Sequence, residues 1–319
     1  MNNRMTVFII SKMLGVEGVL LLIPAFVALL YKEESALHFV VVSGVLFLIF
    51  LLAGRKKPGN RRIYKKEGLL IVGSAWILWS LFGALPFFLS GSIPSYLDAF
   101  FETVSGFTTT GSTILTDIEA LPRGMAFWRS LTHWIGGMGV LVFVMMLTSL
   151  DDENSMHLMR AEVPGPEADK LVPRARTTAQ ILYAMYFVLT AVEVVLLLFG
   201  GMNFYDALLH AFSTAGTGGF SNMNASVAHY DSAYIDGVIT VFMILFGVNF
   251  NLYFLICLRK WKEAFQNEEL HIYLGIIAGA VAVITIDILH QYGNVMRAFR
   301  YASFQVAAII TTTGFCTAD

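Results

Sequence analysis

Seven stretches of this 319-residue chain are almost free of charged side chains and long enough to cross a lipid bilayer. A helix needs roughly 20 mostly apolar residues to span the hydrocarbon core. The stretches are residues 13–30, 35–54, 68–90, 130–150, 177–199, 237–258 and 270–289. Only 14% of the residues are charged, whereas soluble domains average about 25%. The pattern predicts an all-α membrane protein, excludes a soluble domain and, with a net charge of −2, gives no support for a nucleic-acid partner.

Lys and Arg are concentrated in alternate loops. The N-terminus and residues 54–67, 151–176 and 259–263 contain 2, 7, 4 and 3 of them, which is 16 of the 21 in the chain. Basic residues accumulate on the cytoplasmic side of membrane proteins. The distribution therefore predicts a cytoplasmic N-terminus.

Three further apolar segments, residues 96–107, 204–216 and 301–310, are too short to cross, and each is followed by Thr and Gly. They align without gaps on one glycine, with Thr two positions before it and a polar residue nine positions before it. The glycines are Gly111, Gly219 and Gly314; the threonines are Thr109, Thr217 and Thr312; the polar residues are Glu102, His210 and Gln305. Because two spans separate successive copies, all three are expected to enter from the outer face as parallel repeats.

A half-helix followed by a Thr/Gly loop is typical of a pore. Irregular backbone is tolerated at membrane depth only where it is buried in protein or lines a polar cavity. The C-terminal end of a helix carries partial negative charge, and rings of carbonyl oxygens can replace the hydration shell of an alkali cation. The alternative is that the small residues merely permit tight turns or close helix packing.

The shared polar position has two interpretations. Glu102, His210 and Gln305 tie each half-helix to the rear of its loop, or Glu102 adds negative charge to the pore. We favour the scaffold interpretation.

Longer motifs resemble the Trk/Ktr/HKT superfamily of potassium-uptake proteins, and within it the bacterial TrkH type. They are SGFTTTGST at residues 105–113, WRSLTHWIGGMG at 128–139, HAFSTAGTGGFS at 210–221, GVNFNL at 247–252 and TTTGF at 311–315. EGLLIVGSAW at 67–76 and SLFGALPF at 80–87 also fit the start of TrkH-type proteins. The resemblance covers essentially the whole chain.

This resemblance implies a pseudo-fourfold, potassium-channel-like pore built from span, half-helix, filter and span repeats, preceded by two extra spans. The regions expected are residues 1–66 (the two extra spans and a basic loop), 67–150 (first repeat), 151–176 (cytoplasmic connector), 177–263 (second repeat) and 264–319 (partial third repeat). The implied filter residues, which would bind potassium as the transported ion, are Thr109, Thr110, Gly111, Thr217, Gly218, Gly219, Thr312, Thr313 and Gly314. No other cofactor is implied.

The resemblance also implies potassium uptake across the bacterial inner membrane, a homodimer, and control by a cytoplasmic nucleotide-binding subunit of the TrkA type. The chain stops five residues after Gly314, so we expect the last span of the third repeat and all of the fourth to be absent, and residues 1–319 alone not to conduct. One alternative is a symporter coupled to protons or sodium, with Glu193 or Asp287 as the relay; a non-conducting fragment is another. An enzyme is not expected, because no HExxH, GxSxG or P-loop pattern occurs.

Overall fold

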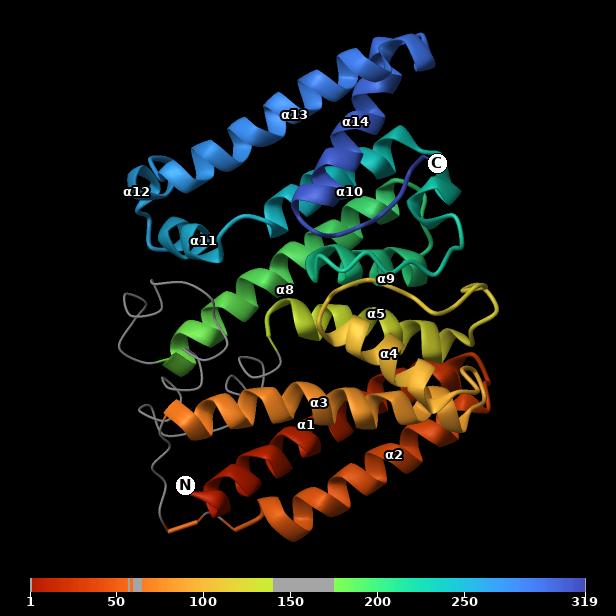
Figure 1. The fold of residues 1–319 in the computed structure, drawn as a ribbon, viewed down its shortest axis with the longest axis vertical. Helices are drawn as coiled ribbons and strands as arrows, with labels where there is room; N and C mark the ends of the chain where they lie inside the picture. The colour runs from red at the N-terminus through yellow and green to blue at the C-terminus, as the bar shows by residue number, and fades with distance from the viewer. Residues whose placement is uncertain (1, 57, 60–64, 140–174, 319) are drawn as a thin grey trace. The chain divides into compact units, whose positions relative to one another are not determined.

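The computed structural model describes all residues except 1, 57, 60–64, 140–174 and 319. The described part is helical and contains no strand, which confirms the predicted all-α class (Figure 1). It divides into two compact units. The first contains residues 1–108 and 112–183, and the second contains residues 109–111 and 184–319.

The first unit contains α1 (Asn3–Leu30), α2 (Ser35–Ile49), the π-helical turn η1 (Phe50–Gly54), α3 (Lys65–Leu89), α4 (Tyr96–Phe107) and α5 (Arg123–Gly137). α1 packs along α2, and α4 packs against both α3 and α5. The ring of Phe107, at the end of α4, meets the Trp79 ring of α3 and the Trp128 ring of α5 edge-on, at centroid distances of 5.5 and 5.9 Å. These contacts hold the end of the first half-helix.

The second unit contains α8 (Ala175–Phe199) from residue 184, α9 (Phe204–Ala215), the short 3-10 helix η3 (Ser226–Tyr230) and α10 (Ala233–Phe246). It continues with α11 (Phe250–Cys257), α12 (Trp261–Phe265), α13 (Glu268–Tyr292) and α14 (Val295–Ile310). Its core joins α8, α9, α10 and α14 through buried Leu197, Ala211, Ile239 and Phe304. Alanines at this core let the half-helices α9 and α14 pack closely against α10.

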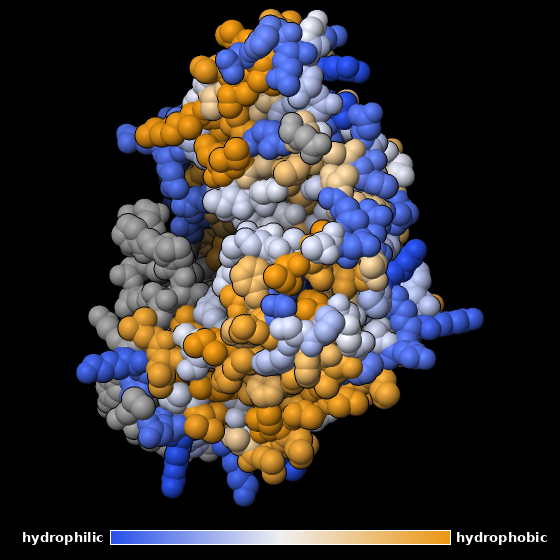
Figure 2. All heavy atoms as spheres, turned by 45° about the vertical axis from the view of Figure 1, so that its right-hand side comes forward, coloured by the Kyte–Doolittle hydropathy of each residue, from blue (hydrophilic) through white to orange (hydrophobic). Residues whose placement is uncertain are grey.

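Five described helices are long and apolar enough to cross a membrane, and they coincide with the predicted spans 13–30, 35–54, 68–90, 177–199 and 270–289. Many of their large apolar side chains are exposed, such as Leu29, Leu37 and Leu52. In Figure 2 apolar residues cover much of the lower part of the view, where Figure 1 places α1, α2 and α3. The predicted span 130–150 lies largely outside the described residues.

The predicted span over residues 237–258 is not one continuous helix. The chain forms two helices, α10 and α11, which are bent by 86° where they meet. A Cβ at Gly247, in the break, would lie 2.5 Å from the Tyr273 hydroxyl and 2.8 Å from the Thr311 methyl carbon, so a side chain there would displace these two groups. Asn249 then caps α11 by accepting a hydrogen bond from the Asn251 amide at 3.0 Å. The third half-helix is also longer than the predicted 301–310, because Asn294 caps α14 ahead of Val295.

Candidate functional site

The three half-helices α4, α9 and α14 begin and end in the same way. Each is N-capped by a polar side chain, from Ser95, Asn203 and Asn294 respectively. Each ends four residues before its aligned glycine, at Phe107, Ala215 and Ile310. The sequence repeat is therefore a repeat of local structure.

The three Thr/Gly loops share an uncommon backbone. The threonine two positions before each glycine is left-handed, with φ of 55° at Thr109, 51° at Thr217 and 59° at Thr312. The glycines are left-handed as well, with φ of 77°, 75° and 78° at Gly111, Gly219 and Gly314. A left-handed conformation costs an L-residue about 1–2 kcal/mol. Three threonines in register with this conformation mark a strained segment of the kind found at functional sites.

The loops meet inside the second unit. A Cβ added to Gly111 would overlap the carbonyl oxygen of Gly218, and a Cβ added to Gly219 would overlap the carbonyl oxygen of Thr313. Each of these glycines thus lies against the main-chain carbonyl of the middle residue in the next loop. Among the described residues, a Cβ at Gly314 would meet no atom within 4 Å. The chemical groups brought together are main-chain oxygens, which are ligands suited to an alkali cation.

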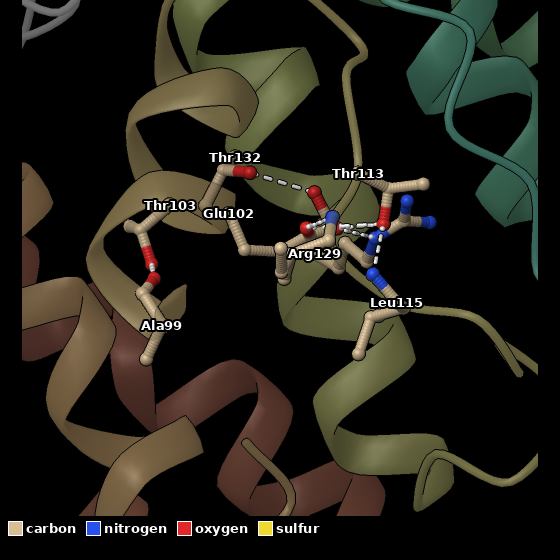
Figure 3. A network of polar contacts seen from close by, with 8 residues as sticks. Ala99, Glu102, Thr103, Thr113, Leu115, Arg129 and Thr132 are labelled. Atoms are coloured by element: carbon tan, nitrogen blue, oxygen red, sulfur yellow. Dashed lines mark hydrogen bonds and ion pairs between the residues drawn. The ribbon is translucent and has the colours of Figure 1, made fainter. Parts of the chain in front are cut away.

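Behind the first loop, the buried side chain of Glu102 is the centre of a polar network that reaches the exposed residues Thr113 and Ile114 (Figure 3). Its carboxylate accepts hydrogen bonds from the Thr113 hydroxyl at 2.9 and 3.0 Å and from the Ile114 amide at 3.0 Å. It also pairs with the Arg129 guanidinium of α5, with Nε 2.5 Å from Oε1. Glu102 and Arg129 are only 1% and 3% exposed. The charge of the carboxylate is thus balanced by Arg129, and its hydrogen bonds hold Thr113 and Ile114, which follow the loop in the chain.

The second loop is held by a histidine and a carboxylate of α9. His210 Nε2 lies 3.1 Å from the Ser221 hydroxyl, and Ser221, like Thr113, is the second residue after the aligned glycine. Asp206, earlier on α9, accepts hydrogen bonds from Asn222 at 2.7 Å and from the Tyr230 hydroxyl at 3.0 Å. Burial and the Asp206 carboxylate raise the pKa of Tyr230 well above its ordinary value, so its hydroxyl stays protonated and donates.

The third loop is held differently. Gln305, half-buried on α14, makes no side-chain hydrogen bond among the described residues. Cys316, the second residue after Gly314, instead bonds through its backbone: its amide donates to the Ser226 hydroxyl at 3.3 Å and its carbonyl accepts from the Ala228 amide at 3.1 Å. The polar residues at the shared position therefore make different contacts in the three copies.

Glu193 and Asp287, the residues considered for a proton or sodium relay, lie away from the loops along the chain. Glu193 is fully buried in α8, whereas Asp287 is exposed on α13. The symporter alternative, with either residue as the relay, stays a prediction.

Two features of the site were not anticipated from the sequence. Arg129 is the partner of Glu102, and its only signal in the sequence was that it is the one Lys or Arg of the motif at residues 128–139. Gly136, in the same motif, lies so close to the end of α4 that a Cβ there would overlap the Phe107 carbonyl oxygen. The motif WRSLTHWIGGMG thus packs α5 against the first half-helix.

Comparison with known proteins agrees with this architecture. The sequence model of TrkH, described as a cation transport protein, matches residues 37–319. The Trk system potassium uptake protein TrkH of Halomonas elongata is 33% identical over 331 aligned positions, which cover 100% of this chain and 67% of that protein. TrkH of Escherichia coli K12 is 35% identical over 305 positions, which cover 93% of this chain and 63% of that protein.

The crystal structure of the potassium transporter TrkH from Vibrio parahaemolyticus superimposes with a TM-score of 0.87 at 30% identity, covering 100% of this chain and 66% of that one. The chain thus spans about two thirds of the length of these relatives. The resemblance inferred from the motifs is confirmed, and the helices long enough to cross a membrane fit a multi-pass membrane protein. The chain belongs to the TrkH family of cation transport proteins.

Proposed function

We propose that this chain forms most of the potassium-conducting pore of a bacterial uptake protein and that its Thr/Gly loops are the selectivity filter. One observation carries the proposal: three loops of the same left-handed backbone meet so that a main-chain carbonyl of one lies against the glycine of another. Relatives of similar sequence are named potassium uptake proteins. The chain would move an ion and would catalyse no change of covalent bonds.

In this proposal potassium loses its water and is coordinated by carbonyl oxygens of residues 109–111, 217–219 and 312–314. Rings of carbonyl oxygens can replace the hydration shell of an alkali cation. The half-helices α4, α9 and α14 end four residues before their glycines, so their partially negative C-terminal ends favour a cation near the loops. The left-handed Thr and Gly residues set the direction in which the intervening carbonyls point.

A fourth loop would complete the pseudo-fourfold ring that the family resemblance implies. The space beside Gly314 is where such a loop would lie, since the corresponding sides of Gly111 and Gly219 each face a carbonyl of the next loop. We expect the complete protein to be a homodimer in the bacterial inner membrane with a cytoplasmic N-terminus. We expect a nucleotide-binding subunit of the TrkA type to regulate it from the cytoplasm, where the basic loops would lie.

The test uses the complete protein in bacteria that lack their own potassium-uptake systems. It should restore growth at low potassium, and Gly111→Ser should weaken the preference for potassium over sodium, because a side chain there has to displace the Gly218 carbonyl. Uptake of K⁺ and of Na⁺ is measured for each variant at matched membrane abundance. Full rescue with unchanged selectivity by a variant substituted at Gly111, Gly219 and Gly314 together would refute the filter assignment.

A further inference from the structure

The ion pair behind the first loop differs in kind from the contacts behind the other two. In the first copy the carboxylate of Glu102 is bound by a guanidinium, whereas in the second copy the equivalent contact joins the His210 ring to the Ser221 hydroxyl. The third copy uses backbone groups of Cys316. A charged pair therefore supports one loop only, among the described contacts.

Arg129 is placed where it can fix this carboxylate. It lies on α5, and its carbonyl accepts a hydrogen bond from the Thr132 hydroxyl at 2.6 Å (Figure 3). The close approach of Gly136 to the Phe107 carbonyl sets α5 against α4, the helix that carries Glu102. A guanidinium presents its donors in a rigid plane, so it determines where the carboxylate lies.

The carboxylate in turn holds the chain immediately after the loop. Thr113 and Ile114, which donate to it, are the second and third residues after Gly111. The Thr113 hydroxyl also accepts a hydrogen bond from the Leu115 amide at 3.1 Å, so three successive residues are ordered around Glu102. If the carboxylate moved, Thr113 and Ile114 would lose their hydrogen bonds to it, and the chain after the first loop would no longer be held in place.

We propose that Arg129 is a positioning residue for the first filter loop, acting through Glu102. This inference rests on the proposed function, because it assigns a selectivity role to a residue that does not touch the ion. The buried charge makes the contact between Arg129 and Glu102 critical, because a carboxylate left without its partner in the protein interior is strongly destabilised.

The experiment compares variants of the complete protein in bacteria deficient in potassium uptake, with K⁺ and Na⁺ uptake and membrane abundance measured for each. Arg129→Gln should raise the KM for potassium, or lower the ratio of K⁺ to Na⁺ uptake, by about tenfold, the effect of losing one hydrogen bond to a charged group. Arg129→Lys keeps the charge without the planar fork and should lose less. The double variant Glu102→Gln with Arg129→Gln removes both charges and should recover part of the loss.

Thr113→Val provides a second probe, because it removes one donor to Glu102 and leaves the ion pair intact. Thr113→Val should lower the ratio of K⁺ to Na⁺ uptake as Arg129→Gln does, but by a smaller factor. If Arg129→Gln fails to reach the membrane, the result for Thr113→Val tests the inference. Lys260→Gln is the matched control: its exposed pair with Glu263, at 3.0 Å, lies on α12, and uptake should not change.

Two results would overturn the inference. The first is that Arg129→Gln or Thr113→Val, at normal membrane abundance, has the KM and the selectivity of the wild type. The second is that uptake falls only in proportion to membrane abundance, while the ratio of K⁺ to Na⁺ uptake stays that of the wild type. Gly111→Ser in the same assay separates this failure from failure of the proposed function. If Gly111→Ser weakens selectivity and the Arg129 variants do not, only the role of Arg129 is refuted.

Discussion

The glycines of the Thr/Gly loops are required for two separable reasons. Each is left-handed, and two of them, Gly111 and Gly219, also lie against a carbonyl oxygen of another loop. Gly293, after α13, is left-handed too, with φ of 62°, but a Cβ there would meet no described atom within 4 Å. Comparison of these positions separates backbone strain from crowding at the site.

Gly219→Ala should abolish selective uptake, whereas Gly293→Ala should leave it close to that of the wild type. Both substitutions incur a left-handed penalty of about 1–2 kcal/mol, but only the first drives a methyl group into the Thr313 carbonyl oxygen. The measurement is K⁺ and Na⁺ uptake by the complete protein at equal membrane abundance. Equal losses in the two variants would mean that strain alone, and not the carbonyl contact, explains the glycine.

Tyr230→Phe should destabilise the second unit by about 1.5–3 kcal/mol, the usual net value of a hydrogen bond to a charged group, because the hydroxyl donates to the Asp206 carboxylate at 3.0 Å. Burial and the Asp206 carboxylate raise the pKa of Tyr230. A raised pKa means that the contribution is fully present below the unfolded pKa of about 10 and is lost only as the pH rises through the folded value.

Thermal unfolding midpoints at pH 7 and pH 9 should therefore differ between Tyr230→Phe and the wild type by the same amount. Tyr234→Phe is the control, since that side chain is 46% exposed and the described residues give its hydroxyl no hydrogen bond. A difference that disappears between pH 7 and pH 9 would show that Tyr230 loses its proton in that interval.

At the residue level, the sequence predicted which positions of the three loops correspond, but it did not predict which side chains contact one another. Spacing alone located the left-handed threonines and glycines, because a repeated backbone needs repeated residue types. It could not pair Glu102 with Arg129, since the two lie 27 positions apart on different helices and neither of the other copies, as far as the structure describes them, contains the pair. Side-chain partners across helices depend on packing, which spacing does not specify.

Among the helices, the break between α10 and α11 was not predicted, because a stretch of apolar residues indicates burial in the membrane but does not show whether the helix changes direction. Broken backbone at membrane depth leaves carbonyl groups that must find donors. Here the Tyr253 hydroxyl donates to the Leu245 carbonyl at 2.7 Å, and the Tyr273 hydroxyl donates to the Ile244 carbonyl at 3.2 Å. In the sequence, only Gly247 and Asn249 indicated the break, and Gly and Asn also occur in continuous spans.

Tyr253→Phe should lower stability by about 1 kcal/mol, the usual net value of one hydrogen bond, because the Leu245 carbonyl keeps its bond from the Val248 amide at 3.2 Å. Tyr292→Phe serves as the control, because the described residues give its hydroxyl no hydrogen bond. The thermal unfolding midpoint of the purified protein should fall for Tyr253→Phe and stay unchanged for Tyr292→Phe. An unchanged midpoint for both would mean that the Leu245 carbonyl does not depend on this hydroxyl.

The whole molecule contains three copies of one local structure, a half-helix followed by a Thr/Gly loop. Three half-helices end at the same distance from their glycines, and three loops repeat one backbone. Parallel repeats of this kind can surround a single axis and present carbonyl oxygens to it from each side. The membrane class and the helix order followed from the sequence, whereas the meeting of loops up to 203 positions apart, from Gly111 to Gly314, required the structure.

The most direct measurement is anomalous X-ray diffraction from crystals of the complete protein grown with Rb⁺ in place of K⁺. The account predicts an anomalous peak coordinated by main-chain carbonyl oxygens of residues 109–111, 217–219 and 312–314. Rb⁺ bound only elsewhere, or loops too far apart to share one ion, would contradict it.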